Sequence, residues 1–480
     1  MQYSTYAFLL AALPLTVAGY YLAGRLGQKQ ANFFLIAASI VMYTFGGWKE
    51  TVWLLVSILG NTLVMLAIHC RKKWRTPLLW LGILFHVGLL FAFKYLNFAA
   101  ETLNLVLHTS LYPPSLVLPL GISFFTFQQI GYLVDFSRGE REGDSFWDYL
   151  LYVVYFPKLI MGPIAKAGDL IPQFHREENI RFRQENFSIG MQRFVFGLCK
   201  KVVLADTFAA AAAFLSMEEA SSAELLLMML AYTFQIYFDF SGYSDMAIGF
   251  SQMLNIELPM NFDSPYKALS VRDFWKRWHM SLTGFLTEYI YFPLGGSRKG
   301  LARTCINTMI VFAVSGLWHG ASLGFVLWGL LNGALSVFER LTDRYRKYIP
   351  RLLQWLVTFA IINVLWLLFQ SGSTTEWLGR LRKMAALSNM SICSGFYGCF
   401  LQPEIKLLAS VFGLDSGSLW FRRLVLIFFY GGTGLLCLVP RNTGRRSYRQ
   451  TTWTAILTAL LLVFCLTCLN KEAAFVYNQF

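Results

Sequence analysis

The apolar residues of this chain gather into separate runs, and each run has about the length that crosses the hydrocarbon core of a bilayer, ~20 residues. We count roughly eleven such runs in the sequence. Hydrophobic residues make up 56% of the 480 residues and charged residues 14%, which is more hydrocarbon than a water-soluble fold can hide. The sequence therefore predicts an all-α polytopic membrane protein and excludes a soluble globular one.

The basic residues are distributed in a way that indicates a membrane partner and no nucleic acid. The formal net charge is +14, but Lys and Arg stand in short clusters between apolar runs and form no continuous stripe. Such clusters are typical of the cytoplasmic side of a membrane protein, where they anchor at the lipid headgroups. We therefore expect the lipid bilayer as a partner.

The first apolar run and the cysteines have plain structural interpretations. The run 6–23 lacks a basic segment before it and a small-residue cleavage site after it, so we interpret it as a retained helix and not as a signal peptide. The eight cysteines are scattered, and the one close pair, Cys465 and Cys468, lies inside an apolar run. Thiols of the membrane core are favoured over a metal or redox site, and we expect no metal.

The basic clusters also predict the topology, because they mark the cytoplasmic side. Pairs of apolar runs separate the clusters that begin near Arg25, Arg71 and Arg138, which places the N-terminus outside the cell. Another basic cluster, 441–449, precedes the last run, 452–469. The last run is therefore expected to lead outward, and the tail after it to be external.

The middle of the chain is less regular. Segments 157–172 and 261–303 mix aromatic, charged, Gly and Pro residues close to apolar runs. Irregular backbone at membrane depth is tolerated only where protein or a water-filled cavity surrounds it, so we expect re-entrant or interfacial helices and a buried cavity. We find no repeat and no linker, which predicts one integral-membrane domain over 1–480 with its core at 150–340 and an external interfacial insert at 371–400.

His319 is the most conspicuous ionisable residue. It lies in 315–322 between two apolar stretches, and an ionisable side chain in that setting is a functional hypothesis by default. About 16 residues of helix from Arg303 rise ~24 Å of a ~30 Å core, which places His319 in the outer half of the membrane. Gly316 and Gly320 would leave room for a substrate. A histidine that only hydrogen-bonds between helices is the alternative.

A second cluster, 273–282, alternates aromatic and basic residues and contains Arg277, Trp278 and His279. It would suit an amphipathic helix at the inner headgroups, where tryptophans and cations anchor, or it could contribute to a substrate site. The remaining four histidines are interpreted as interfacial or capping residues: His69, His86, His108 and His175.

A third segment, 232–246, places the carboxylates of Asp239 and Asp245 in an apolar stretch. Acids inside a membrane are costly and usually line a cavity or pair with a cation. Pairing with an arginine of the second cluster is favoured slightly over direct catalysis. Either way, the two aspartates would help to shape the site.

Four segments together carry a resemblance to a known family. They are Tyr155–Ile164, Tyr237–Asp245, the triplet 277–279 and the triplet 318–320. In this order they resemble the membrane-bound O-acyltransferase family, in its bacterial polysaccharide branch with alginate O-acetyltransferase and the teichoic-acid D-alanyl transfer protein. The likeness covers most of the chain and is strongest over 152–340. The run 291–298 looks more like the alginate type.

The resemblance implies a helical ring around a central membrane tunnel. It assigns the catalytic role to His319 and makes His279 a second site residue on the cytoplasmic side. Besides what the resemblance implies, we expect five further residues to bind or orient substrate: Arg277, Trp278, Trp318, Asp239 and Asp245. The resemblance also implies a thioester donor from inside, acyl-coenzyme A or an acyl carrier protein, and a hydroxyl acceptor outside, with no bound cofactor.

The last six residues, 475–480, resemble the Phe-x-Tyr-x-x-Phe ending that the teichoic-acid system carries on a separate small peptide. In that system a tyrosine is proposed to hold the acyl group in transit. Tyr477 would be a relay nucleophile here, since a phenol ester stays reactive toward a further transfer. An aromatic tail that packs at the membrane interface is the alternative.

The expected reaction starts with His319, which as a neutral imidazole takes the proton of an attacking hydroxyl, from Tyr477 or from the acceptor. The acyl group, with acetyl favoured over D-alanyl, would move across a bacterial cytoplasmic membrane to a polysaccharide or cell-wall polymer. With a Tyr477 relay, an extracellular SGNH-type transferase would complete the transfer. The rival function is a polysaccharide transporter or exporter, for which we find no inverted repeats. A structural scaffold is the third possibility.

Overall fold

The computed structural model describes residues 2–114, 116–446 and 448–469. All regular elements within these residues are helical, as the sequence predicts. The described residues cluster into two compact units. Within the described residues, the first contains 2–114, 116–195, 244–260 and 448–458, and the second contains 196–243, 261–446 and 459–469. The prediction of one integral-membrane domain stays a prediction.

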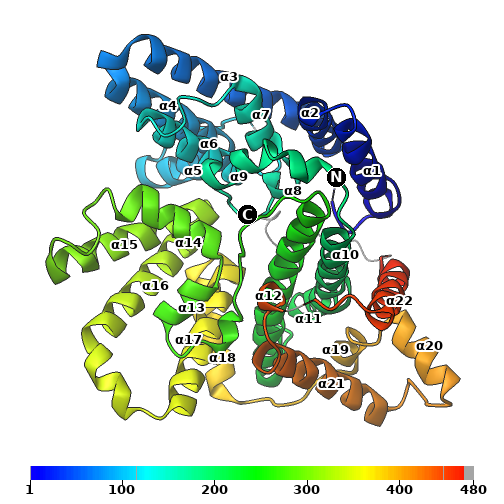
Figure 1. The fold of residues 1–480 in the computed structure, drawn as a ribbon. Helices are drawn as coiled ribbons and strands as arrows, with labels where there is room; N and C mark the ends of the chain where they lie inside the picture. Colours follow the sequence, from blue (N-terminus) through cyan, green and yellow to red (C-terminus); the bar gives the residue numbers. More distant parts are fainter. Residues whose placement is uncertain (1, 115, 447, 470–480) are drawn as a thin grey trace. The chain divides into compact units, whose positions relative to one another are not determined.

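The first unit is built from helices of the N-terminal part of the chain, drawn from blue to teal in Figure 1. They are α1 (Leu13–Gly24), α2 (Gln28–Thr44), α3 (Trp48–Cys70), α4 (Arg75–Leu90), α5 (Leu96–Leu107), α6 (Ile122–Ser137), α7 (Phe146–Val154), α8 (Phe156–Leu159) and α9 (Ala167–Phe174). Helices α10 (Gln184–Cys199), α12 (Ser222–Met253) and α22 (Thr452–Cys468) continue from one unit into the other.

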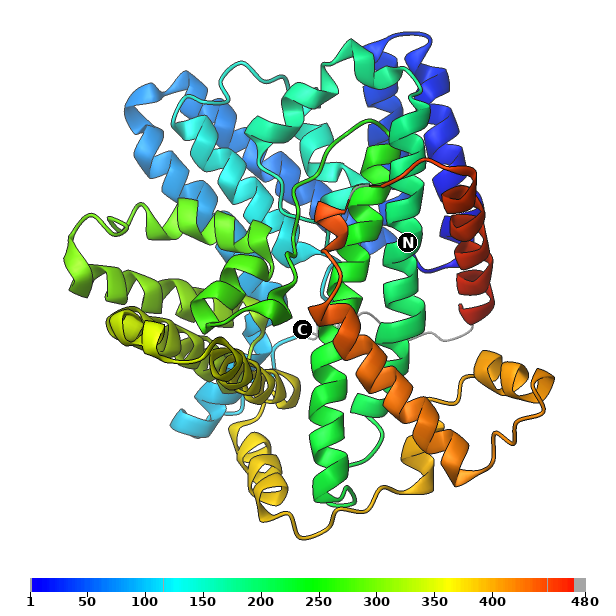
Figure 2. The same cartoon turned by 60° about the horizontal axis from the view of Figure 1, so that its bottom comes forward.

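The second unit contains His319, the cluster 273–282 and Asp239, whereas Asp245 lies in the first unit. The helices of the second unit are α11 (Asp206–Ala212), α13 (Val271–Arg277), α14 (Met280–Leu286), α15 (Gly300–His319), α16 (Leu323–Thr342), α17 (Arg351–Ser371), α18 (Thr374–Ala386), α19 (Ser394–Gly398), α20 (Pro403–Val411) and α21 (Leu419–Leu438). Helices α15 and α16 form a hairpin whose two arms lie side by side (Figures 1 and 2).

Six helices within the described residues are long and apolar enough to cross a membrane. They span Trp48–Cys70, Lys72–Leu107, Ser222–Met253, Gly300–His319, Arg351–Ser371 and Leu419–Leu438. Two shorter apolar helices, Phe8–Gly24 and Thr452–Cys468, accompany them. A polytopic membrane protein is confirmed, but the count of about eleven spans is not. One reason is length, since α6 has 16 residues and α7 only 9.

The irregular backbone predicted for 157–172 is present in the first unit. The chain leaves regular helix after Leu159 and returns to it at Ala167, and residues 155–165 are buried. A Cβ on Gly162 would lie 2.4 Å from the Pro157 carbonyl oxygen, so only glycine fits this tight turn. Polar groups around the segment satisfy its backbone; for example, Ser39 Oγ accepts from Phe156 N at 3.1 Å.

His86 is not at a span end, contrary to the sequence-based interpretation. It is fully buried within α4, and its Nε2 lies 3.2 Å from Asn61 Oδ1. The Asn61 amide donates to the Tyr149 hydroxyl, which donates to Gln129 Oε1. The sequence pattern does not predict Asn61 as the partner of His86, because the hydrogen bond joins two different helices. His108, in contrast, is the C-cap of α5, which confirms a capping role.

Candidate active site

His319 is the last residue of α15, the helix that starts at Gly300. The side chain is 4% exposed and lies among aromatic rings. The centroid of its imidazole is 4.8 Å from that of Trp318, 5.3 Å from that of Trp328 on α16 and 5.2 Å from that of Phe369 on α17. Three helices therefore hold one imidazole in an apolar, nearly water-free setting.

Glycines set the distance between α15 and α16. A Cβ on Gly316 would lie 2.4 Å from the Phe325 carbonyl oxygen, and a Cβ on Gly329 would lie 2.4 Å from the Phe312 carbonyl oxygen. Small residues at a helix interface let two backbones approach closely. At Gly320 a Cβ would lie 2.1 Å from the Phe325 ring. The space that we assigned to a substrate beside these glycines is thus filled by α16.

We expected the cluster 273–282 to form one amphipathic helix, but it does not. Helix α13 ends at Arg277, α14 starts at Met280, and His279 between them has φ 45°, a left-handed conformation. Main-chain bonds to a distant segment impose this break. Asp263 N donates to Arg277 O at 2.9 Å. Met280 N donates to Asn261 O, also at 2.9 Å.

With this break in the helix, both candidate histidines lie against the same aromatic residue, Trp318. His279 is 1% exposed, and its ring centroid lies 6.1 Å from that of Trp318, the same ring that contacts His319. Phe240 of α12 meets His279 edge-on at 4.7 Å. Burial lowers the pKa of His279 to about 3, because a buried imidazole disfavours its charged form. His279 is therefore neutral at physiological pH.

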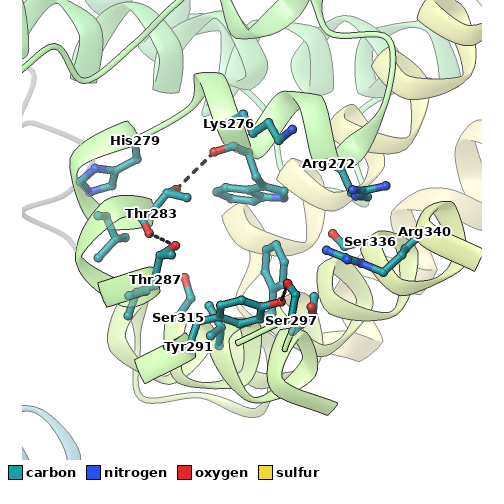
Figure 3. A pocket seen from close by; sticks show the side chains of 16 residues that line it. Arg272, Lys276, His279, Thr283, Thr287, Tyr291, Ser297, Ser315, Ser336 and Arg340 are labelled. Carbon is teal, nitrogen blue, oxygen red and sulfur yellow. Dashed lines mark hydrogen bonds between the residues drawn. The ribbon is translucent and has the colours of Figure 1, made fainter. Parts of the chain in front are cut away.

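His279 also lines a cavity of about 280 Å³ within the second unit (Figure 3). The walls come from α13, α14, the π-helical turn Thr287–Tyr291, α15 and α16, and π-turns are frequent at functional sites. Most of the wall is apolar or weakly polar: Trp275, Leu282, Thr283, Leu286, Val311 and Phe312. A cavity is thus present at 261–303, as predicted, but it is partly open and not fully buried.

Three cationic side chains line this cavity: Arg272, Lys276 and Arg340. None of them was predicted as a site residue from the sequence. In Figure 3, Arg272 and Arg340 lie together beside Ser336, across the cavity from His279. Lys276 lines the cavity one helical turn after Arg272. Among the described residues, none of the three has a carboxylate within salt-bridge distance. Glu339 is close in sequence, but its carboxylate accepts from the backbone N–H groups of Val271 and Arg272 and so caps α13.

Arg277 and Trp278, in contrast, have structural partners. Arg277 Nε donates to Asp273 Oδ1 at 2.9 Å. The Trp278 side chain is 1% exposed and packs against Phe262 and Trp366, with ring centroids 5.0 and 4.9 Å away. Of the triplet 277–279, only His279 lines the cavity.

The two intramembrane aspartates pair with cations, but not with those of the second cluster. In the second unit, Lys201 Nζ lies 2.8 Å from Asp239 and 2.8 Å from Asp206. In the first unit, Arg193 Nε lies 3.1 Å from Asp245. The expectation of ion pairing is confirmed, and the expected partner in 273–282 is wrong. The sequence reveals the acids, but not which helix carries the cation.

The matched family model decides which protein family this chain belongs to. The model for the membrane-bound O-acyltransferase family, MBOAT, matches residues 133–373, half of the chain. The chain belongs to the membrane-bound O-acyltransferase family. The MBOAT match contains both histidines, the cavity and the pairs of Asp239 and Asp245. This confirms the resemblance that the four sequence segments carry.

Relatives of this MBOAT protein are named for acyl transfer. A peptidoglycan O-acetyltransferase of Helicobacter pylori is 38% identical, over 82% of this chain and 81% of its own length. A probable alginate O-acetylase of Pseudomonas putida is 32% identical, over 100% of this chain and 99% of its own. A teichoic acid D-alanyltransferase of Bacillus subtilis is 27% identical, over 52% and 66%. This MBOAT chain is a multi-pass membrane acyltransferase. Tyr477 lies outside the described residues.

Proposed function

We propose that this protein transfers a short acyl group, acetyl, from a phosphate-bearing thioester to a hydroxyl of a cell-surface glycan. The observation that supports this best is the pair of buried histidines on Trp318, one of which lines a cavity flanked by three cations. A general base at a buried site beside an anion-binding cavity is what acyl transfer from such a donor requires.

The cavity fits the arm of the donor. Acyl-coenzyme A and acyl carrier protein both present a thioester at the end of a long, mostly uncharged arm that begins at a phosphate. Arginine recognises phosphate through paired N–H donors, and Arg272 and Arg340 stand together with Lys276 nearby. The arm would run from these cations through the apolar part of the cavity toward His279. Cavity size then favours a short acyl group.

His319 acts as the general base in this proposal. The hydroxyl oxygen of the acceptor attacks the carbonyl carbon of the thioester, and its proton moves to the His319 imidazole. The carbon–sulfur bond breaks, and the thiolate leaves with the proton that His319 received. His319 is neutral again at the end, and no other reactant is needed.

The acceptor is assigned by chemistry and by the names of the relatives. Two of them, an alginate O-acetylase and a peptidoglycan O-acetyltransferase, share 32% and 38% identity with this chain, against 27% for the D-alanyl enzyme. We therefore favour acetylation of a polysaccharide or cell-wall polymer outside the bacterial cytoplasmic membrane. Tyr477 would serve as an acyl relay, with an SGNH-type transferase outside the cell.

Surface-polymer acetylation tests the function in cells. We compare ester-linked acetate on the cell-surface polymer of cells that carry the wild type, His319→Ala or His69→Ala. His69 is an exposed histidine in the last turn of α3 and serves as the matched control. We expect loss of acetate only with His319→Ala. Normal acetate in His319→Ala cells would overturn the proposal, and transport of a glycan without thioester consumption would establish the exporter instead.

A further inference from the structure

The hydrogen bonds of Asn261 have a fixed direction. Its Oδ1 atom lies 3.0 Å from His279 Nδ1. The backbone N–H of Ser281 points at the same oxygen at 3.3 Å, and the Ser281 hydroxyl donates to it at 2.9 Å. A backbone N–H is only ever a donor, so the atom that it meets must be the amide oxygen and not the NH2 group. The Asn261 amide cannot be reversed at this position.

This direction determines the tautomer of His279. Because the Asn261 oxygen only accepts, His279 must donate from Nδ1, and a neutral imidazole carries just one N–H. We propose that Asn261 is a positioning residue that fixes His279 as the Nδ1–H tautomer, so that the Nε2 atom carries no hydrogen and can act only as a hydrogen-bond and proton acceptor. Burial keeps the ring neutral, as its lowered pKa indicates.

Main-chain hydrogen bonds also hold Asn261 and His279 next to each other. Asn261 also accepts through its main-chain oxygen from Met280 N, on the other side of His279. The segments around Asn261 and His279 are therefore joined by side-chain and main-chain bonds at once. The left-handed φ of 45° at His279 is unusual for a residue with a side chain. Such a conformation persists only where surrounding bonds over-determine it, and these positions concentrate at functional sites.

The tautomer restricts what His279 does in the reaction. A bare Nε2 cannot donate to the negative oxygen that develops on the thioester carbonyl, so His279 is not an oxyanion donor. It accepts instead from a group that carries a hydrogen, such as an amide N–H of the donor arm or the attacking hydroxyl. The identity of that group rests on the proposed function, whereas the tautomer does not.

Nitrogen NMR measures the tautomer directly. We record spectra of the full-length protein in lipid with 15N-labelled histidine at neutral pH and assign His279 by its absence in His279→Gln. The wild type should show a protonated Nδ1 and an unprotonated Nε2. Asn261→Leu, which cannot accept, should populate the Nε2–H form. Asn261→Asp and Ser281→Ala should keep the Nδ1–H form, because a carboxylate still accepts and the Ser281 backbone N–H is retained.

An Nε2–H ring in the wild type, or an unchanged tautomer in Asn261→Leu, would overturn the inference. In the acetyl-transfer assay, Asn261→Leu should lower kcat/KM about 10- to 100-fold, the effect of losing a residue that orients a functional histidine, and Asn261→Asp should restore most of it. An Nδ1–H tautomer in a protein that transfers no acyl group overturns the proposed function alone. Transfer by an Nε2–H protein overturns this inference alone.

Discussion

At the scale of single residues, burial decides how His279 behaves. The pKa of His279 falls to about 3 from its ordinary 6.5, because burial disfavours the charged form of the ring. His279 is thus an uncharged acceptor throughout the pH range in which cells live. The cations at the cavity, Arg272 and Arg340, have the opposite role, because they bring charge to its wall.

The lowered pKa predicts a pH-dependent contribution to stability. In the unfolded chain His279 binds a proton below about pH 6.5, whereas in the folded protein it stays neutral down to about pH 3. The folded state therefore loses stability relative to the unfolded state as the pH falls from about 6.5 toward about 3. The free energy of unfolding in detergent, measured at several pH values, should therefore fall more steeply in the wild type than in His279→Gln. Parallel curves for the two proteins would contradict the assigned pKa.

Loss of a cavity cation should weaken binding of the donor without slowing the chemical step. Arg272→Gln and Arg340→Gln should each raise the KM for acetyl-coenzyme A roughly tenfold, as expected for one lost charge-assisted contact, and leave kcat nearly unchanged. Arg298→Gln is the matched control, because Arg298 is exposed and does not line the cavity. Steady-state kinetics at two salt concentrations measure the effect. An unchanged KM in both cavity variants would place the phosphate elsewhere.

At the scale of elements, the α15–α16 hairpin positions His319, and its close packing depends on glycine. The sequence predicts α15 well: an apolar stretch follows Arg303 and continues to His319. It does not predict the break at Trp278–His279, because no Gly or Pro marks it and the cause is a set of hydrogen bonds to 261–263. The cation partners of Asp239 and Asp245 could not be predicted either, because these ion pairs also join segments far apart in the sequence.

Replacement of Gly316 tests the hairpin. Gly316→Ala places a methyl group 2.4 Å from the Phe325 carbonyl oxygen, so the helices must separate, which should cost about 1–3 kcal/mol. Gly434→Ala in α21 is the control, because open space surrounds a Cβ there. It should gain up to about 1 kcal/mol from helix propensity. Unfolding in detergent compares the two, and equal stability would show that the close approach is not needed.

At the scale of the whole molecule, composition predicts a polytopic helical membrane protein, and the helices and the family match confirm it. The number of spans could not be predicted, since several apolar runs fold into helices too short to cross a bilayer. The site could be predicted in part. Four sequence segments pointed to His319 and His279, whereas Asn261 and the cavity cations emerge only from the tertiary contacts.

Two native cysteines test the predicted topology. Cys70 and Cys393 are both exposed; Cys70 precedes a basic cluster expected inside, and Cys393 lies in the insert expected outside. In single-cysteine variants, a membrane-impermeant maleimide added to intact cells should label Cys393 and not Cys70, and permeabilised cells should label both. Labelling of Cys70 in intact cells would invert the topology and the proposed direction of transfer.

The most direct test of acyl transfer through His319 uses purified protein in lipid with radiolabelled acetyl-coenzyme A and an acceptor glycan. Wild type and His69→Ala should release coenzyme A and transfer label to Tyr477 or to the glycan. His319→Ala should do so at least 100-fold more slowly, the lower end for a general base. Undiminished release of coenzyme A and label transfer by His319→Ala would contradict the assignment of His319.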